Sequence, residues 1–138
     1  MRVDFYVVER GDADTVACRL ADKAFGQGLR VFIRTGDPER TRRLDDLLWT
    51  FHGQSFVPHA PQENAGPEMP VVLGEQAPDG AVDLVINLAD RPPESPHRYQ
   101  RVAEVVGPAA DDRRAARERF RYYRDELGRE PETHRIRS

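Results

Sequence analysis

Three arginines and one phenylalanine recur at helical spacing near the end of this 138-residue chain. Arg113, Arg117, Phe120 and Arg124 stand at positions i, i+4, i+7 and i+11, which places them along one stripe of a helix. Guanidinium groups form charge-assisted hydrogen bonds with carboxylates, and a ring between them adds an apolar contact. One interpretation of the stripe is a shallow site for a peptide that ends in an apolar side chain beside carboxylates. A solvated charged face with Phe120 partly in the core explains the same spacing and stays open as the alternative.

The charge around this stripe differs from that of the rest of the chain. The whole sequence has 21 Lys+Arg and 24 Asp+Glu, a formal charge of −3. Residues 113–138 carry nine basic and five acidic groups, so a cationic segment follows an anionic body. Such a segment attracts anions over roughly 8–10 Å at physiological salt. The overall negative charge disfavours broad binding of duplex DNA, and a small acidic ligand fits better.

Other reactive residues lack the neighbours that catalysis or metal binding requires. Cys18 is the sole cysteine, has no flanking base, and is predicted to be a packed thiol. His52 and His59 are predicted to be loop or surface histidines, because no cysteine or third histidine lies nearby. The first strand-to-helix turn, residues 9–15, has one glycine and three acidic residues where a phosphate cradle would stand. We expect no enzymatic activity, no metal and no cofactor. A Rossmann-type nucleotide-binding protein or enzyme is the alternative, and a general binder of nucleic acid ranks last.

Aromatic side chains gather around an irregular turn in the first half of the chain. Trp49 and Phe51 follow a predicted helix, and Phe56 lies in a short extended piece after the turn. Large aromatic residues in such a place either fill the core or anchor a protein partner. Both interpretations stay open from composition alone.

Alternating strand and helix patterns must position these groups. Apolar runs predict strands at residues 3–8, 29–34, 69–73, 81–88 and 99–106. Helices are predicted after the turn at 11–15, from Asp37-Pro38 to about Trp49, and from Asp111 or Asp112 to Leu127. This order predicts one α/β domain over residues 1–138, with a largely parallel sheet covered on both faces. The opening residues are too charged for a signal sequence or a membrane span, so we expect a cytoplasmic protein.

Two motifs resemble a known family. The first is Arg43-Leu44-Asp45-Asp46-Leu47-Leu48-Trp49 followed by Ser55-Phe56-Val57-Pro58-His59, and the second is Ala116-Arg117-Glu118-Arg119-Phe120-Arg121-Tyr122-Tyr123-Arg124. Together with the opening Phe5-Tyr6 strand, they resemble the chi subunit of bacterial DNA polymerase III holoenzyme over nearly the whole chain. The resemblance implies a Rossmann-like three-layer fold with no nucleotide-binding loop, acting as a non-catalytic adaptor that meets DNA only indirectly.

The resemblance also implies two protein partners. Members of the family bind the acidic C-terminal tail of single-stranded DNA-binding protein, which ends in a proline and a phenylalanine carboxylate, and the psi subunit of the clamp loader. Carried over by position, the residues implied for the tail are Arg113, Arg117, Phe120, Arg124 and Thr133. Those implied for psi, or for another protein at the same face, are Trp49, Phe51 and Phe56.

Overall fold

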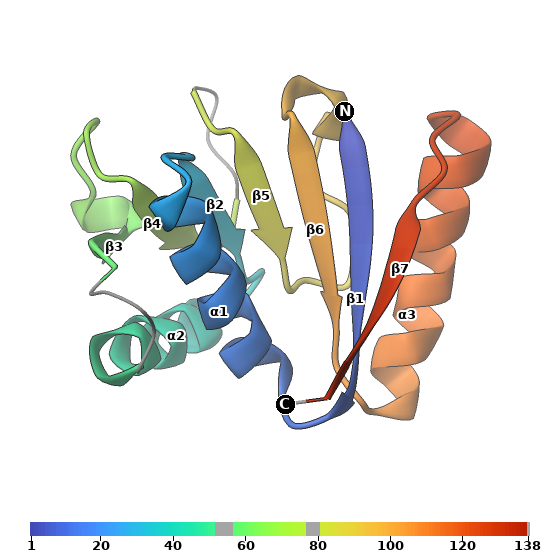
Figure 1. Cartoon of the computed structure of the whole chain (residues 1–138), viewed down its shortest axis with the longest axis horizontal. Helices are drawn as coiled ribbons and strands as arrows, with labels where there is room; N and C mark the ends of the chain where they lie inside the picture. The colour runs from blue at the N-terminus through green and yellow to red at the C-terminus, as the bar shows by residue number, and fades with distance from the viewer. Residues whose placement is uncertain (52–56, 77–80, 138) are drawn as a thin grey trace.

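Strands and helices alternate along most of the chain (Figure 1). The computed structural model describes residues 1–51, 57–76 and 81–137. Within these ranges the elements are β1 (Arg2–Arg10), α1 (Ala13–Gly26), β2 (Val31–Arg34), α2 (Pro38–Thr50), β3 (His59–Pro61), β4 (Val71–Gly74), β5 (Leu84–Asn87), β6 (Arg101–Val106), α3 (Ala110–Arg121) and β7 (Glu132–Arg137). Single 3-10 turns lie at Gln62–Asn64 and Pro96–Arg98.

The described strands form a single sheet in the order β3-β4-β2-β5-β6-β1-β7. Every neighbouring pair is parallel. Helices α1 and α2 lie on one face of this sheet, and α3 lies on the other (Figure 1). The predicted α/β fold with a largely parallel sheet is confirmed. A helix that spans a bilayer needs about 20 mostly apolar residues. Among the described residues, no helix is both long enough and apolar enough to do so.

Each face of the sheet has its own apolar cluster. The larger cluster joins α1 and α2 to the inward side chains of β2, β4 and β5, and it contains the thiol of Cys18. Burial raises the pKa of that thiol to about 12, so the predicted packed cysteine is confirmed. The smaller cluster joins α3 to β1 and β6 through residues such as Phe5, Val102 and Tyr123. Helix α3 therefore packs on the sheet through this second, smaller cluster.

The last strand, β7, was not predicted from the pattern of residues. It pairs in parallel with β1 at the edge of the sheet, with Glu132 opposite Asp4 and Arg137 opposite Arg10. Four of its six residues are exposed, and it contains no apolar run. Strand prediction relies on apolar residues, so a charged edge strand escapes it.

Helix α3 differs from its predicted form at both ends. It begins at Ala110 after the N-cap Ala109, so neither Asp111 nor Asp112 caps it as predicted. Beyond Arg121 the backbone widens into a π-helical turn over Tyr122–Glu126. Gly128 then adopts a positive φ of 65°, which suits glycine and ends the helix close to the predicted position.

A buried carboxylate ties α3 to the sheet. Glu104 of β6 is 0% exposed and accepts hydrogen bonds from Arg119 Nε at 2.8 Å and Tyr123 Oη at 2.7 Å. Asn87 Nδ2 of β5 donates to the same carboxylate at 2.9 Å. Burial raises the pKa of Glu104, while these donors oppose the rise by stabilising the ionised form. Because Arg119 and Tyr123 stand one helical turn apart, the contacts specify which side of α3 meets the sheet.

Tyr123→Phe is expected to lower the free energy of unfolding by about 1.5–3 kcal/mol, the range for a hydrogen bond to a charged group. Urea denaturation followed by circular dichroism measures this change. The matched control is Tyr122→Phe, at the half-buried neighbour, which we expect to stay within about 0.5 kcal/mol of the parent. Equal stability of the two variants would contradict a supporting role for the Tyr123 hydroxyl.

Candidate functional site

A hollow of about 240 Å³ lies between α3 and the edge of the sheet at β1, β6 and β7. Its lining residues are Phe5, Val7, Val106, Arg113, Ala116, Arg117, Phe120, Thr133 and Arg135. Pockets for drug-sized ligands have volumes of roughly 300–1,000 Å³. The size of this hollow therefore suits a single side chain with its neighbouring polar groups.

The floor of the hollow is aromatic and aliphatic. Phe5 is buried on β1, and its ring centroid lies 5.4 Å from that of the half-buried Phe120 at an interplanar angle of 53°. Val7 follows Phe5 on the same face of β1, because side chains alternate along a strand. Ala116 on α3 is small and leaves the space open. A hydrophobic ring entering here would contact other rings at a favourable tilted geometry.

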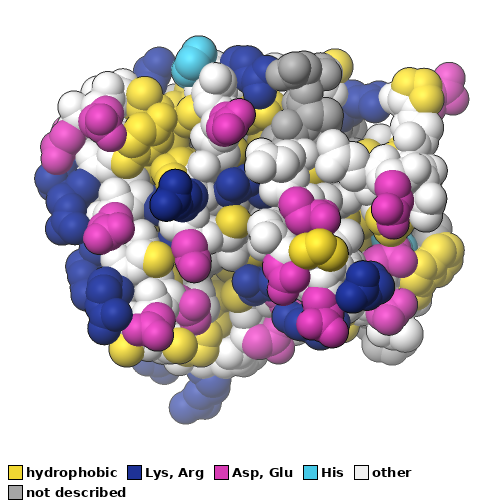
Figure 2. Space-filling view, turned by 180° about the vertical axis from the view of Figure 1, so that it is seen from behind, with side chains coloured by type: hydrophobic (Ala, Val, Ile, Leu, Met, Phe, Trp, Pro, Cys, Tyr) yellow, Lys and Arg dark blue, Asp and Glu magenta, His cyan; other side chains and the backbone are white. Residues whose placement is uncertain are grey.

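Guanidinium groups surround this apolar floor. Arg113 and Arg117 come from successive turns of α3, and Arg135 comes from β7. Arg113 Nε is buried, and among the described residues it has no hydrogen-bond partner. An Arg135 terminal nitrogen lies 4.0 Å from a carboxylate oxygen of Glu9. Basic side chains gather along the outer side of α3, at the left of Figure 2. Arg113, Arg117 and Arg135 all line the hollow, so it suits an anionic group that accepts charge-assisted hydrogen bonds from their guanidinium groups.

The structure brings together four of the five residues predicted for this site: Arg113, Arg117, Phe120 and Thr133. Arg124 is not among the lining residues. It lies in the π-helical turn, where the wider winding takes it off the stripe, and its Nε pairs with Asp125 at 2.8 Å. This ion pair on the surface lowers the pKa of the Asp125 carboxyl.

The sequence analysis missed five lining residues: Phe5, Val7, Val106, Ala116 and Arg135. Phe5 and Val7 stand two apart in a predicted strand, a spacing that places them on one face. Arg135 stands two residues after Thr133, so the same alternation would have indicated it once β7 was recognised as a strand.

The aromatic residues predicted for a second partner separate into different environments. Trp49 at the end of α2 is 61% exposed, and its ring lies 4.9 Å from that of His59 in an edge-on arrangement. Phe51 is half-buried and packs against the larger core cluster. Phe56, like His52, falls outside the described residues. His59 is buried, contrary to the prediction of a loop or surface histidine, because its ring bonds to the Val57 carbonyl at 2.7 Å.

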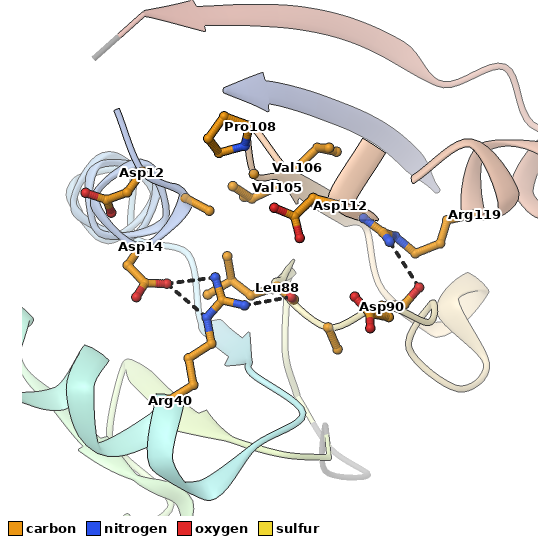
Figure 3. Close-up of a pocket in the computed structure, with 13 residues that line it drawn as sticks. Asp12, Asp14, Arg40, Leu88, Asp90, Val105, Val106, Pro108, Asp112 and Arg119 are labelled. Carbon is orange, nitrogen blue, oxygen red and sulfur yellow. Dashed lines mark hydrogen bonds and ion pairs between the residues drawn. The ribbon is translucent and has the colours of Figure 1, made fainter. Parts of the chain in front are cut away.

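A separate crevice of about 170 Å³ opens at the carboxyl ends of β5 and β6 (Figure 3). Doubly wound α/β proteins bind phosphates and nucleotides at such a place. Here the crevice is lined by four carboxylates, those of Asp12, Asp14, Asp90 and Asp112.

Both arginines of this crevice are already engaged with protein groups. Arg40 pairs with Asp14 at 2.8 Å and donates to the Leu88 carbonyl at 3.1 Å. Arg119 pairs with Glu104 and donates to the Asp90 carbonyl at 3.0 Å. The Thr15 amide in the first turn of α1 donates to the Asp12 carboxylate at 2.8 Å. A phosphate would therefore meet carboxylates in this crevice, which weighs against the nucleotide-binding alternative.

One group of residues in the described ranges has the composition of a metal site. Ligand atoms of Asp4, Glu132 and His134 lie within 4.8 Å of one another. Arg2 Nε lies 3.1 Å from the Asp4 carboxylate, and an Arg101 terminal nitrogen lies 3.6 Å from it. These guanidinium groups already balance the buried carboxylate and repel a cation, so the arrangement is that of an ion-pair network.

Known proteins are similar to this chain along most of its length. The family described as DNA polymerase III chi subunit, HolC, matches residues 1–129. A Pseudomonas aeruginosa protein named DNA polymerase III subunit chi is 43% identical over 129 residues, which cover 91% of this chain and 90% of the relative. An Escherichia coli protein of the same name is 25% identical over 114 residues, which cover 80% and 78%. The family match includes α3 and Trp49 and ends before β7.

Proposed function

Because the chain belongs to the DNA polymerase III chi subunit family, we propose that it is a non-catalytic adaptor of the holoenzyme in the cytoplasm. One surface binds the acidic C-terminal tail of single-stranded DNA-binding protein. A second surface binds a psi-type subunit of the clamp loader. The protein thereby links the polymerase assembly to protein-coated single strands without touching the DNA itself.

The observation that carries the tail assignment is the hollow beside α3. It combines an aromatic floor with the guanidinium groups of Arg113, Arg117 and Arg135. A chain terminus that ends in phenylalanine supplies both complements, a ring for the floor and a carboxylate for the guanidinium.

Each part of the bound tail would contact a different group of residues at the hollow. The terminal ring enters beside Phe120, and the terminal carboxylate accepts from Arg113. Acidic side chains before the terminus lie over the exposed Arg117. Shallow sites of this kind typically bind with micromolar dissociation constants, which correspond to a binding free energy of about −8 kcal/mol. The charged contacts make binding sensitive to salt, because screening acts strongly on exposed charges.

Arg117→Ala is expected to weaken binding of an acidic peptide ending in proline and phenylalanine by about 30-fold, the effect of a hot spot of about 2 kcal/mol. Isothermal calorimetry on the full chain measures the dissociation constant. The matched control is Arg121→Ala, which removes one exposed arginine from the same helix away from the hollow. If both variants lose the same affinity, the effect comes from the overall charge of the helix, and this result would contradict the proposed site.

The second surface is centred on Trp49. An indole ring 61% exposed at the end of a helix offers a large apolar contact, and tryptophan is enriched among residues that dominate binding energy. Its edge-on contact with His59 holds the ring in place before binding. Phe51, two residues further on, is half-buried against the larger core cluster and contributes the inner part of this surface.

Trp49→Ala is expected to change the free energy of unfolding by less than about 1 kcal/mol, because most of the ring is in solvent. The same variant should reduce capture of a psi-type subunit by at least about 30-fold in surface plasmon resonance. Arg42→Ala, at another exposed position of α2, is the control and should bind normally. Undiminished capture by the Trp49 variant would remove this surface from the proposal.

A further inference from the structure

Strand β7 leaves one long edge of the sheet open. It is the last strand in the sheet order, and within the described residues no strand lies on its outer side. Every second residue of a parallel edge strand turns its N–H and C=O groups away from the neighbouring strand. β7 has six residues, four of them exposed, so its outer edge offers solvent-facing backbone donors and acceptors.

This open edge is continuous with the hollow beside α3. Thr133 and Arg135 of β7 line the hollow, while His134 between them faces the other side and stacks on Tyr6 with centroids 4.8 Å apart. The rim of the hollow on this side is therefore the edge strand itself. A peptide whose last residue lies in the hollow can leave it along β7 in an extended conformation.

We propose that the acidic segment preceding the terminus of the bound tail pairs with β7 as an eighth strand of the sheet. This inference rests on the proposed function and extends the same site along the sheet edge. Backbone hydrogen bonds to β7 supply affinity that depends little on the identity of the tail's side chains, as in other cases of strand addition.

The charges on β7 favour an acidic strand. Arg135 and Arg137 lie two apart and therefore on one face of the strand, the face toward α3. A strand added beside β7 would direct alternate side chains to that same face, close to the exposed Arg117. Opposite charges across neighbouring strands are stabilising, and like charges are destabilising. A second copy of β7 would set arginines against arginines, so the charges disfavour self-pairing.

The other edge of the described sheet is a poorer template. β3 has three residues, His59–Pro61, and it ends in a proline that has no backbone N–H to donate. The proposal therefore assigns strand addition to β7.

Two peptides with the same four C-terminal residues test the proposal on the full-length protein. The short one contains only those residues, and the long one has eight preceding residues rich in aspartate. Hydrogen exchange of individual amides, followed by nuclear magnetic resonance, is measured over 132–137 and around the hollow. We expect both peptides to perturb the hollow, and only the long peptide to slow exchange at alternate residues of β7.

N-methylation of the long peptide separates strand pairing from simple attraction between charges. Methyl groups on every second backbone amide before the terminus preserve length and charge but remove donors from one edge of the added strand. Of the two alternating patterns, one is expected to lower affinity at least about 5-fold and the other to leave it near that of the parent. The two methylated peptides serve as controls for each other.

Three outcomes would overturn the proposal. Equal affinity of both methylated peptides, with β7 amides unprotected, leaves only charge attraction and keeps the proposed tail site intact. Concentration-dependent protection of β7 without peptide assigns the edge to a second copy of the chain. Absence of binding by either peptide removes the proposed tail site and the strand addition together.

Discussion

The hydrogen bonds to Glu104 determine how α3 sits on the sheet, and the candidate site depends on that placement. Arg119 and Tyr123 point inward to this carboxylate from one side of the helix. The adjoining stripe, which holds Arg113, Arg117 and Phe120, is thereby directed to the gap between α3 and the sheet edge. A helix held by apolar contacts alone could rotate by a fraction of a turn and close the hollow, whereas buried charged groups tolerate little misalignment.

Two concave regions lie against the same sheet, and the charges that line them favour different ligands. The crevice at the carboxyl ends of β5 and β6 is the ordinary ligand position of this architecture, yet it is lined by carboxylates. The hollow beside α3 is lined by arginines over aromatic rings. This member of the chi family thus has a doubly wound scaffold, while its candidate binding surface lies elsewhere, on α3 and the edge strand.

Sequence reasoning succeeded where the physical signal was local. Apolar runs and glycine stops located most strands and helices, and helical spacing grouped Arg113, Arg117 and Phe120 on one stripe. It failed where contacts between distant parts of the chain determine whether a segment forms a strand or whether a side chain is buried. β7 is polar and becomes a strand by pairing with β1, and Arg119 belongs to a charged motif yet is only 4% exposed because Glu104 neutralises it. No local pattern distinguishes that buried arginine from its exposed neighbours on α3.

The claim that a chain terminus inserts its ring beside Phe120 is tested most directly by a double-mutant cycle in calorimetry. The cycle combines Phe120→Ala with a tail peptide in which the terminal phenylalanine is replaced by alanine. If the two rings contact each other, either change alone weakens binding, and the two together weaken it by less than the sum of the separate effects, with a coupling of about 0.5–1.5 kcal/mol. Strict additivity would place the terminal ring elsewhere and contradict the account.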